Sequence, residues 1–170
     1  NAGAPALIYD LAQQSALQQQ IFGRALEGIF PLYYPPIYLL VCAVLAWLPY
    51  LAGFAVWVIA TGGLLLAVLT RIAGDWRLAV ALASFPAAIV NLGLGQNAFV
   101  TAALLGLGTV LVDGQPWLAG IVFGALAFKP HFLVLVPIAL LAGRRWRALG
   151  GMAMSVASLT AVSVLACGLG

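Results

Sequence analysis

Residues 117–147 read WLAGIVFGALAFKPHFLVLVPIALLAGRRWR, and this stretch decides the fold class. Two apolar runs, 117–128 and 132–142, enclose Lys129 and His131, which are the only lysine and the only histidine of the chain. A straight membrane-spanning helix needs about 20 residues, so each run is too short to cross a bilayer. We therefore expect a helical hairpin whose tip lies below the membrane surface, beside a protein-lined or watery cavity.

The composition of the 170 residues excludes an ordinary soluble domain. Hydrophobic residues make up 65% of the chain and charged residues 6%, against about 45–50% and about 25% in soluble domains. The mean hydropathy is +1.13. Such apolar surface must face lipid or other apolar helices, which excludes secreted disulfide scaffolds, nucleic-acid-binding modules and disordered chains. We predict an all-α, polytopic transmembrane helical bundle with short and re-entrant helices, integral to a bacterial-type plasma membrane.

The apolar sequence that begins at Ile37 is divided by prolines and polar residues into predicted helices. Two of them, 50–70 and 148–168, are long enough to span a membrane, and the stretches 76–92 and 96–113 reach that length with their polar ends included. The other pieces are shorter. The predicted helices are 37–48, 50–70, 78–91, 98–112, 117–128, 132–142 and 148–168.

Residues 1–36 are predicted to form an extracytoplasmic loop with an interfacial helix, and residues 37–170 a transmembrane helical bundle that is a fragment of a larger domain. Glutamines interleave with apolar residues over 11–22, a pattern typical of a helix in the membrane interface; a flexible polar tail is the alternative. If 37–48 is a re-entrant half-helix, the loop is extracytoplasmic; if 37–48 spans, the loop is cytoplasmic. Twelve residues are too few to span comfortably, which favours the first arrangement.

The topology follows from the basic residues, which concentrate in cytoplasmic loops of membrane proteins. Five of the seven lie at two breaks between helices, 71–77 and 144–147, and we assign both breaks to the cytoplasm. The four predicted helices between them then place the turns 91–97 and 129–131 on the extracytoplasmic side.

The lysine between the two short helices is the most informative residue. A charge at membrane depth is costly and usually functional, so Lys129 is predicted to bind an anionic group such as a lipid phosphate. The alternative is a lysine that extends to the membrane interface. His131 could donate a hydrogen bond to the same phosphate or carry a proton, or it could be a hydrogen-bonded structural group.

Amide side chains cluster in the predicted turn at 91–97. Asn91, Gln96 and Asn97 could hydrogen-bond sugar hydroxyls, and the glycines between them let a backbone approach a ligand closely. A capped turn between two helices is the alternative. We add Tyr34 to the predicted sugar-binding residues, since it precedes the bundle at the interface, where tyrosine rings collect.

Acidic residues are scarce. Asp75 and Asp113 face the cytoplasm in this topology, which leaves Asp10 and Glu27 for an extracytoplasmic site, and Asp10 is the better candidate for a general base. One histidine and two separated cysteines cannot build a usual zinc site, so we expect no metal and no cofactor.

Several short motifs occur in a fixed order, and together they extend over nearly the whole chain. They are YDL at 9–11, YPP at 34–36, LPY at 48–50, GQN at 95–97, LAG at 118–120, FKP at 128–130 and RRWR at 144–147. This order resembles glycosyltransferase family 87, the polytopic mannosyltransferase-like enzymes with the C-type membrane fold.

The resemblance implies a membrane hexosyltransferase that moves a mannose-like sugar from a polyprenyl-phosphate donor to a lipid or glycan acceptor outside the cytoplasm. Its partners would be these two substrates and membrane lipids, with no nucleic acid. Lys129 would stabilise the leaving phosphate, while His131 and a carboxylate, with Asp10 as the candidate, would act in catalysis.

Family members carry an acidic residue, proposed as the base, in a first extracytoplasmic loop that would precede the start of this chain. We therefore expect that both ends are cut, that the main catalytic acid lies upstream of Asn1, and that the fragment alone is inactive. Two other function classes stay open: a transporter or flippase segment that binds an anionic or lipid-phosphate substrate in broken helices, and a non-catalytic membrane scaffold.

Overall fold

The computed structural model describes residues 9–23 and 34–167, and every regular element in these ranges is helical. This confirms the predicted all-α class. The elements are α1 (Leu11–Phe22), α2 (Pro36–Leu45), α3 (Tyr50–Ala73), α4 (Trp76–Ala83), α5 (Pro86–Leu94), α6 (Ala98–Leu111), α7 (Pro116–Gly124), the 3-10 helix η2 (Ala125–Phe128), α8 (Phe132–Ala142) and α9 (Trp146–Cys167).

Two of the described helices, α3 and α9, are long and apolar enough to cross a membrane, as the sequence predicts. A third span is possible if α4 and α5 count as one, although they are bent by 69°. The prediction of a single helix over 78–91 is therefore wrong. Pro86 begins α5 and holds Phe85 in an extended conformation, φ −57° and ψ 141°, because the residue before a proline is disfavoured in a helix.

Helices α7 and α9 form the tightest contact in the fold. A Cβ atom on Gly120 would overlap the backbone carbonyl of Ala148, and one on Gly124 would lie 2.5 Å from the Cβ of Ser155. The Ser155 hydroxyl donates a hydrogen bond of 3.0 Å to the carbonyl of Ile121. Small residues thus let two apolar helices meet backbone to backbone, as is usual in membrane bundles.

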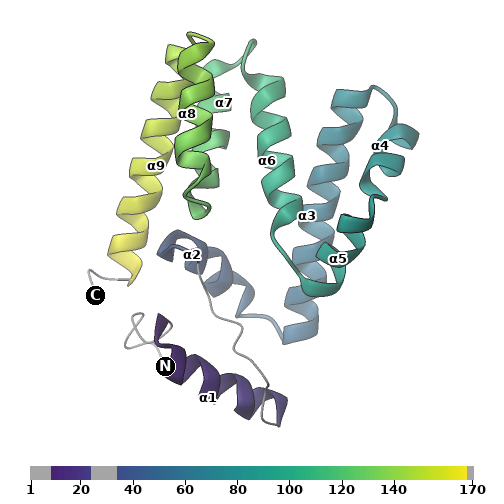
Figure 1. The fold of residues 1–170 in the computed structure, drawn as a ribbon, viewed down its shortest axis with the longest axis vertical. Helices are drawn as coiled ribbons and strands as arrows, with labels where there is room; N and C mark the ends of the chain where they lie inside the picture. Colours follow the sequence, from purple (N-terminus) through teal and green to yellow (C-terminus); the bar gives the residue numbers. More distant parts are fainter. Residues whose placement is uncertain (1–8, 24–33, 168–170) are drawn as a thin grey trace.

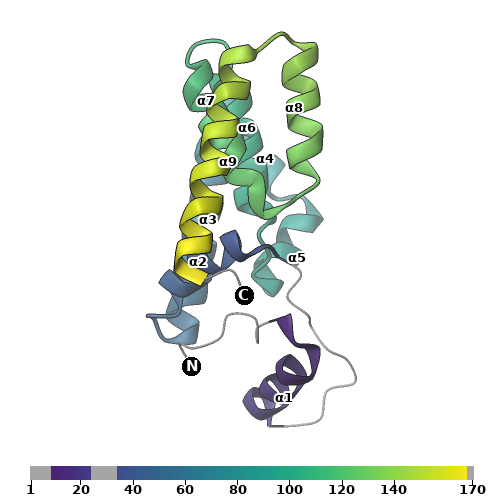
Figure 2. The same cartoon turned by 90° about the vertical axis from the view of Figure 1, so that its left-hand side faces the viewer.

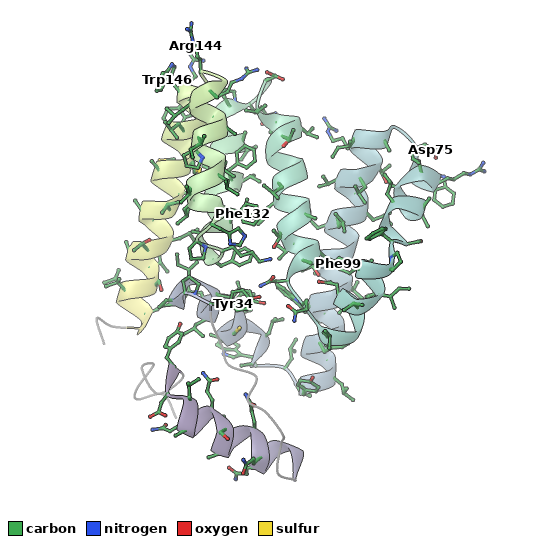
Figure 3. The ribbon with its side chains drawn as sticks, viewed as in Figure 1. Tyr34, Asp75, Phe99, Phe132, Arg144 and Trp146 are labelled. Carbon is green, nitrogen blue, oxygen red and sulfur yellow. The ribbon has the colours of Figure 1, made fainter. Side chains whose placement is uncertain are left out.

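The polar turns separate to the two ends of the bundle (Figure 1). One end, which we call the arginine end, carries Asp75, Asp113 and residues 144–147; Figure 3 shows Asp75, Arg144 and Trp146 there. An ion pair between Arg145 and Asp113 joins two of its turns. The other end, which we call the lysine end, contains α2, the α5–α6 turn and Lys129. This separation agrees with the alternating passes predicted from the sequence.

The hairpin made by α7, η2 and α8 is shorter than the bundle. Its tip stops well before the far end of α9, and α2 crosses beneath it in both views (Figure 1, Figure 2). The segments Pro116–Phe128 and Phe132–Ala142 are both below spanning length. Lys129 therefore lies at a tip recessed within the length of the bundle, with α2 beyond it.

Helix α1 lies outside the bundle, beyond the lysine end (Figure 2). Asp10 begins it, since the carboxylate accepts hydrogen bonds from the backbone N–H groups of Ala12, at 2.9 Å, and Gln13, at 3.2 Å. The Tyr9 hydroxyl donates to the carbonyl of Tyr34 at 2.9 Å, which ties this helix to the start of α2.

Candidate functional site

An aromatic cluster around Tyr38 forms the centre of the lysine end. Pro36 starts α2. Two residues along this helix, the Tyr38 ring packs against Tyr34, with centroids 4.6 Å apart, and against Phe128, at 5.6 Å. The Trp57 ring in α3 lies nearly perpendicular to the Tyr38 ring, with centroids 6.3 Å apart. Tyr38 therefore connects α2 with both the spanning helix α3 and the hairpin that carries Lys129.

The two asparagines of the α5–α6 turn are buried, with 4% of Asn91 and 3% of Asn97 exposed. The Asn91 side-chain oxygen accepts a hydrogen bond of 3.0 Å from the backbone N–H of Ala98, and Gly95 turns the chain with φ +60°. The Asn97 side chain lies beside the Tyr38 hydroxyl. Asn91 thus closes the turn, while Asn97 faces the aromatic cluster.

Gln96 lies between these two buried asparagines but is itself exposed. The Gln96 amide is therefore accessible to a ligand, whereas the Asn91 side chain already accepts a hydrogen bond from the backbone. The alternative reading as a capped turn holds for Asn91, and Gln96 is the accessible amide of the three.

Lys129 follows η2 in an extended conformation, with φ −121° and ψ 94°. The Lys129 N–H donates a hydrogen bond to the Leu126 carbonyl, and the Lys129 carbonyl accepts one from the Phe132 N–H. The side chain is half-buried, and this burial lowers the pKa of the ammonium group, because desolvation penalises the charged form. Within residues 9–23 and 34–167, no carboxylate forms an ion pair with it.

His131 lies on the far side of Pro130 and is exposed. Its ring is 4.4 Å from that of Phe132, and Figure 3 shows Phe132 near the hairpin tip and Tyr34 next to α2. His131 is thus close to Lys129 along the chain and accessible at the surface.

Of the two predicted acids, Asp10 is exposed and caps α1, and Glu27 lies outside the described residues. The structure therefore brings Tyr34 and Asn97 together around Tyr38 and Phe128. Lys129 follows Phe128 directly in the chain, and Gln96 lies at the adjoining turn. The structure does not bring Asp10 into this cluster. Tyr38 was missed by the sequence reasoning, because it shares a helix with none of the aromatic residues that it contacts.

A cavity of about 550 Å³ lies beside the aromatic cluster, between α2, the start of α3 and the end of α5. A second apolar groove of about 400 Å³ lies between α8 and α9. In the part of the chain that the structure describes, no three histidine, cysteine or acidic side chains gather in a way that could hold a metal ion.

A recessed cation next to buried amides and aromatic rings, in a helical bundle of membrane-spanning length, defines a membrane protein with a polar site at one end. The family model of glycosyltransferase family 87 matches residues 32–170. The chain therefore belongs to this family, and the match includes the whole cluster from Tyr34 to Lys129. No curated protein sequence and no solved structure matches the chain.

Proposed function

We propose that the intact protein is a hexosyltransferase that uses a polyprenyl-phosphate sugar as donor and a lipid or glycan as acceptor on the extracytoplasmic face of a bacterial-type plasma membrane. The observation that carries this proposal is Lys129, a half-buried cation without a described carboxylate partner at a recessed hairpin tip. Such a cation is suited to an anionic group that reaches it from the membrane. Residues 1–36 would lie on the same extracytoplasmic side.

In the proposed reaction, the acceptor hydroxyl attacks the anomeric carbon of the donor sugar. The bond from this carbon to the phosphate oxygen breaks, and its electron pair stays on the phosphate. Lys129 stabilises the negative charge that develops there, an interaction worth most in a site that excludes water. His131 donates a further hydrogen bond to the phosphate from the rim of the site.

The proton of the acceptor hydroxyl passes to a carboxylate base. Asp10 is the one described carboxylate beyond the lysine end, since Asp75 lies at the arginine end and Asp113 pairs with Arg145 there. For the sugar, Gln96 offers an exposed amide, while Asn97 and the Tyr34 ring line the adjoining cluster. Asn91 contributes by holding the turn that presents them.

The test replaces Lys129 by alanine in the intact membrane protein and measures transfer of labelled mannose from a polyprenyl-phosphate donor. We expect a loss of roughly 100-fold or more in kcat/KM, comparable to removing one donor that stabilises a developing oxyanion. Lys129→Arg, which keeps the charge, should retain more activity than Lys129→Ala.

The matched control is Arg144→Ala, which removes an exposed cation at the opposite end. It should leave transfer unchanged, and all variants should accumulate in the membrane to the same level. Unchanged transfer in Lys129→Ala, or equal losses in both alanine variants, would overturn the proposal.

A further inference from the structure

Tyr38 is a point at which four separate elements meet. Its ring, on α2, packs 5.6 Å from that of Phe128 in η2 and 6.3 Å from that of Trp57 in α3. Asn97, the residue before α6, lies beside its hydroxyl. Both centroid distances are within the range of about 4.5–7 Å at which aromatic rings attract each other. One side chain thus links α2, α3, α6 and the hairpin tip.

Helix α2, which crosses beneath the hairpin tip (Figure 1), lies on the surface of the bundle. None of its ten residues, all of them described, is buried. The segment before it is tied to α1 by the hydrogen bond from the Tyr9 hydroxyl to the Tyr34 carbonyl, and the Tyr34 ring packs 4.6 Å from that of Tyr38. Because a helix without buried residues gains little stability from core packing, its position depends strongly on the aromatic contacts of Tyr38.

The hairpin tip connects the position of Phe128 to that of Lys129. Phe128 is buried, with 6% of it exposed, and it ends η2 directly before Lys129. The Lys129 N–H donates a hydrogen bond of 2.8 Å to the Leu126 carbonyl, and the Phe132 N–H donates one of 3.0 Å to the Lys129 carbonyl. Because these bonds hold the backbone on both sides of the lysine, a displacement of Phe128 also displaces Lys129.

We infer that Tyr38 is a positioning residue, whose ring holds Phe128 and thereby fixes where the Lys129 ammonium group lies. The hydroxyl is not needed for this role, since the contacts with Tyr34, Trp57 and Phe128 are made by the ring. Loss of the ring lets the tip move and makes the half-buried lysine more accessible to water. The placement of Lys129 is independent of any reaction, and only its consequence for sugar transfer rests on the proposed function.

The first test measures the reaction of Lys129 with a water-soluble amine reagent over a range of pH, in the intact membrane protein, with the labelled peptide identified by mass spectrometry. Lys129 is the only lysine of the 170 residues. We expect Tyr38→Leu to raise the limiting rate at high pH at least severalfold. The midpoint should move up towards the ordinary lysine pKa of about 10.4, because burial lowers the pKa in the native protein.

Tyr38→Phe keeps the ring and should keep the native rate and midpoint. Tyr50→Leu is the matched control, since Tyr50 begins α3 and is 83% exposed. If Tyr38→Leu does not accumulate in the membrane, Tyr38→Met fills the same space with a flexible chain and is measured instead. Native labelling in the variant without the ring, or the same change in Tyr50→Leu, would overturn the inference.

The second test asks whether Tyr38 acts through Phe128. Phe128→Leu alone should change the labelling of Lys129 as Tyr38→Leu does. The double variant should go no further than the stronger single variant, because residues that act through one contact are not additive. If the two effects multiply instead, Tyr38 and Phe128 act on Lys129 independently and the inference is wrong.

Sugar transfer gives a third readout, which rests on the proposed function. Tyr38→Leu should lower kcat more than it raises KM, because a misplacement of about 1 Å can cost roughly 100-fold in rate, and Tyr38→Phe should restore kcat. An equal loss in Tyr38→Phe would show that the hydroxyl itself acts and would overturn the positioning role. If the labelling changes as expected but the native protein transfers no sugar, the positioning role stands and only the proposed reaction is refuted.

Discussion

The two ends of the bundle differ in how deeply their polar residues are buried. At the arginine end, Asp75, Asp113 and Arg144 are all exposed, and the ion pair between Arg145 and Asp113 is largely solvated. At the lysine end, Asn91 and Asn97 are buried and Lys129 is half-buried. Burying a polar group costs free energy unless protein hydrogen bonds replace those it made to water. The burial of polar groups at one end therefore indicates where a ligand site would lie.

The helices are also packed more closely at the arginine end than at the lysine end. Near the arginine end, α7 and α9 meet with Gly120 and Gly151 against backbone atoms of the partner helix. At the lysine end, α2 and α3 diverge and leave an open pocket between them. The difference suggests that one end supplies rigidity and the other supplies room for a substrate, and the following predictions test this contrast.

The largest expected effect is at the tight contact. Gly120→Leu places a side chain where the Ala148 backbone lies, and we expect a loss of about 3 kcal/mol or more in stability, at or beyond the usual cost of overpacking. Gly63→Leu is the control, since nothing lies within 4 Å of a Cβ at that helical position. Thermal unfolding in detergent measures both. Equal midpoints for the two variants would show that α7 and α9 are not held this closely.

A smaller effect is expected in the α5–α6 turn. Asn91→Ala leaves the Ala98 N–H without its acceptor, which costs about 1–3 kcal/mol for a buried group. Gln96→Ala should change stability by less than about 0.5 kcal/mol but raise KM for the donor or acceptor. If Gln96→Ala destabilised the protein as much as Asn91→Ala, the division between a structural and an accessible amide would be wrong.

The pH dependence of transfer depends on the protonated form of Lys129. Burial lowers the pKa of this lysine. The folded protein therefore loses the proton at a lower pH than the unfolded chain, in which the pKa of a lysine is about 10.4. Its stability should therefore rise with pH between the two values, while kcat/KM falls as pH passes the lowered pKa.

Lys129→Arg keeps its charge over this range, so the alkaline fall in kcat/KM should move to higher pH. Arg144→Lys is the control at the other end and should leave the profile as it is. A profile that is the same for the native protein and Lys129→Arg would mean that another group titrates.

The smallest effect is expected for the ion pair at the arginine end. Asp113→Ala removes the partner of Arg145, but both side chains are substantially exposed, at 74% and 45%. Exposed pairs contribute about 0.2–1 kcal/mol, and added salt should reduce the difference further. Unfolding measured at low and high ionic strength checks this; a loss that salt does not reduce would show a structural role beyond the charge pair.

Much of the fold could be predicted because lipid imposes a simple rule on helix composition. The predicted helices 98–112 and 132–142 agree with α6 and α8 to within a residue at each end. The break at Pro86 was missed, because apolar residues continue on both sides of it. The alternation of turns between the two ends followed from the arginines alone.

Less of the site could be predicted, since its residues come from separate parts of the chain. Lys129 is recognisable as a lone charge among apolar residues. Tyr38 is not, because its neighbours Trp57, Asn97 and Phe128 are distant in sequence and only the fold brings them together. Nor does composition distinguish the buried Asn97 from the exposed Gln96 beside it.

The most direct test of the account asks whether the two ends face opposite sides of the membrane. His131→Cys and Arg144→Cys, both at exposed positions, are made separately with Cys42 and Cys167 replaced by alanine, and intact cells are treated with a membrane-impermeant thiol reagent. We predict that His131→Cys is labelled from outside and that Arg144→Cys is labelled only after the membrane is opened. Labelling of both from the same face, or the reverse pattern, would contradict the account.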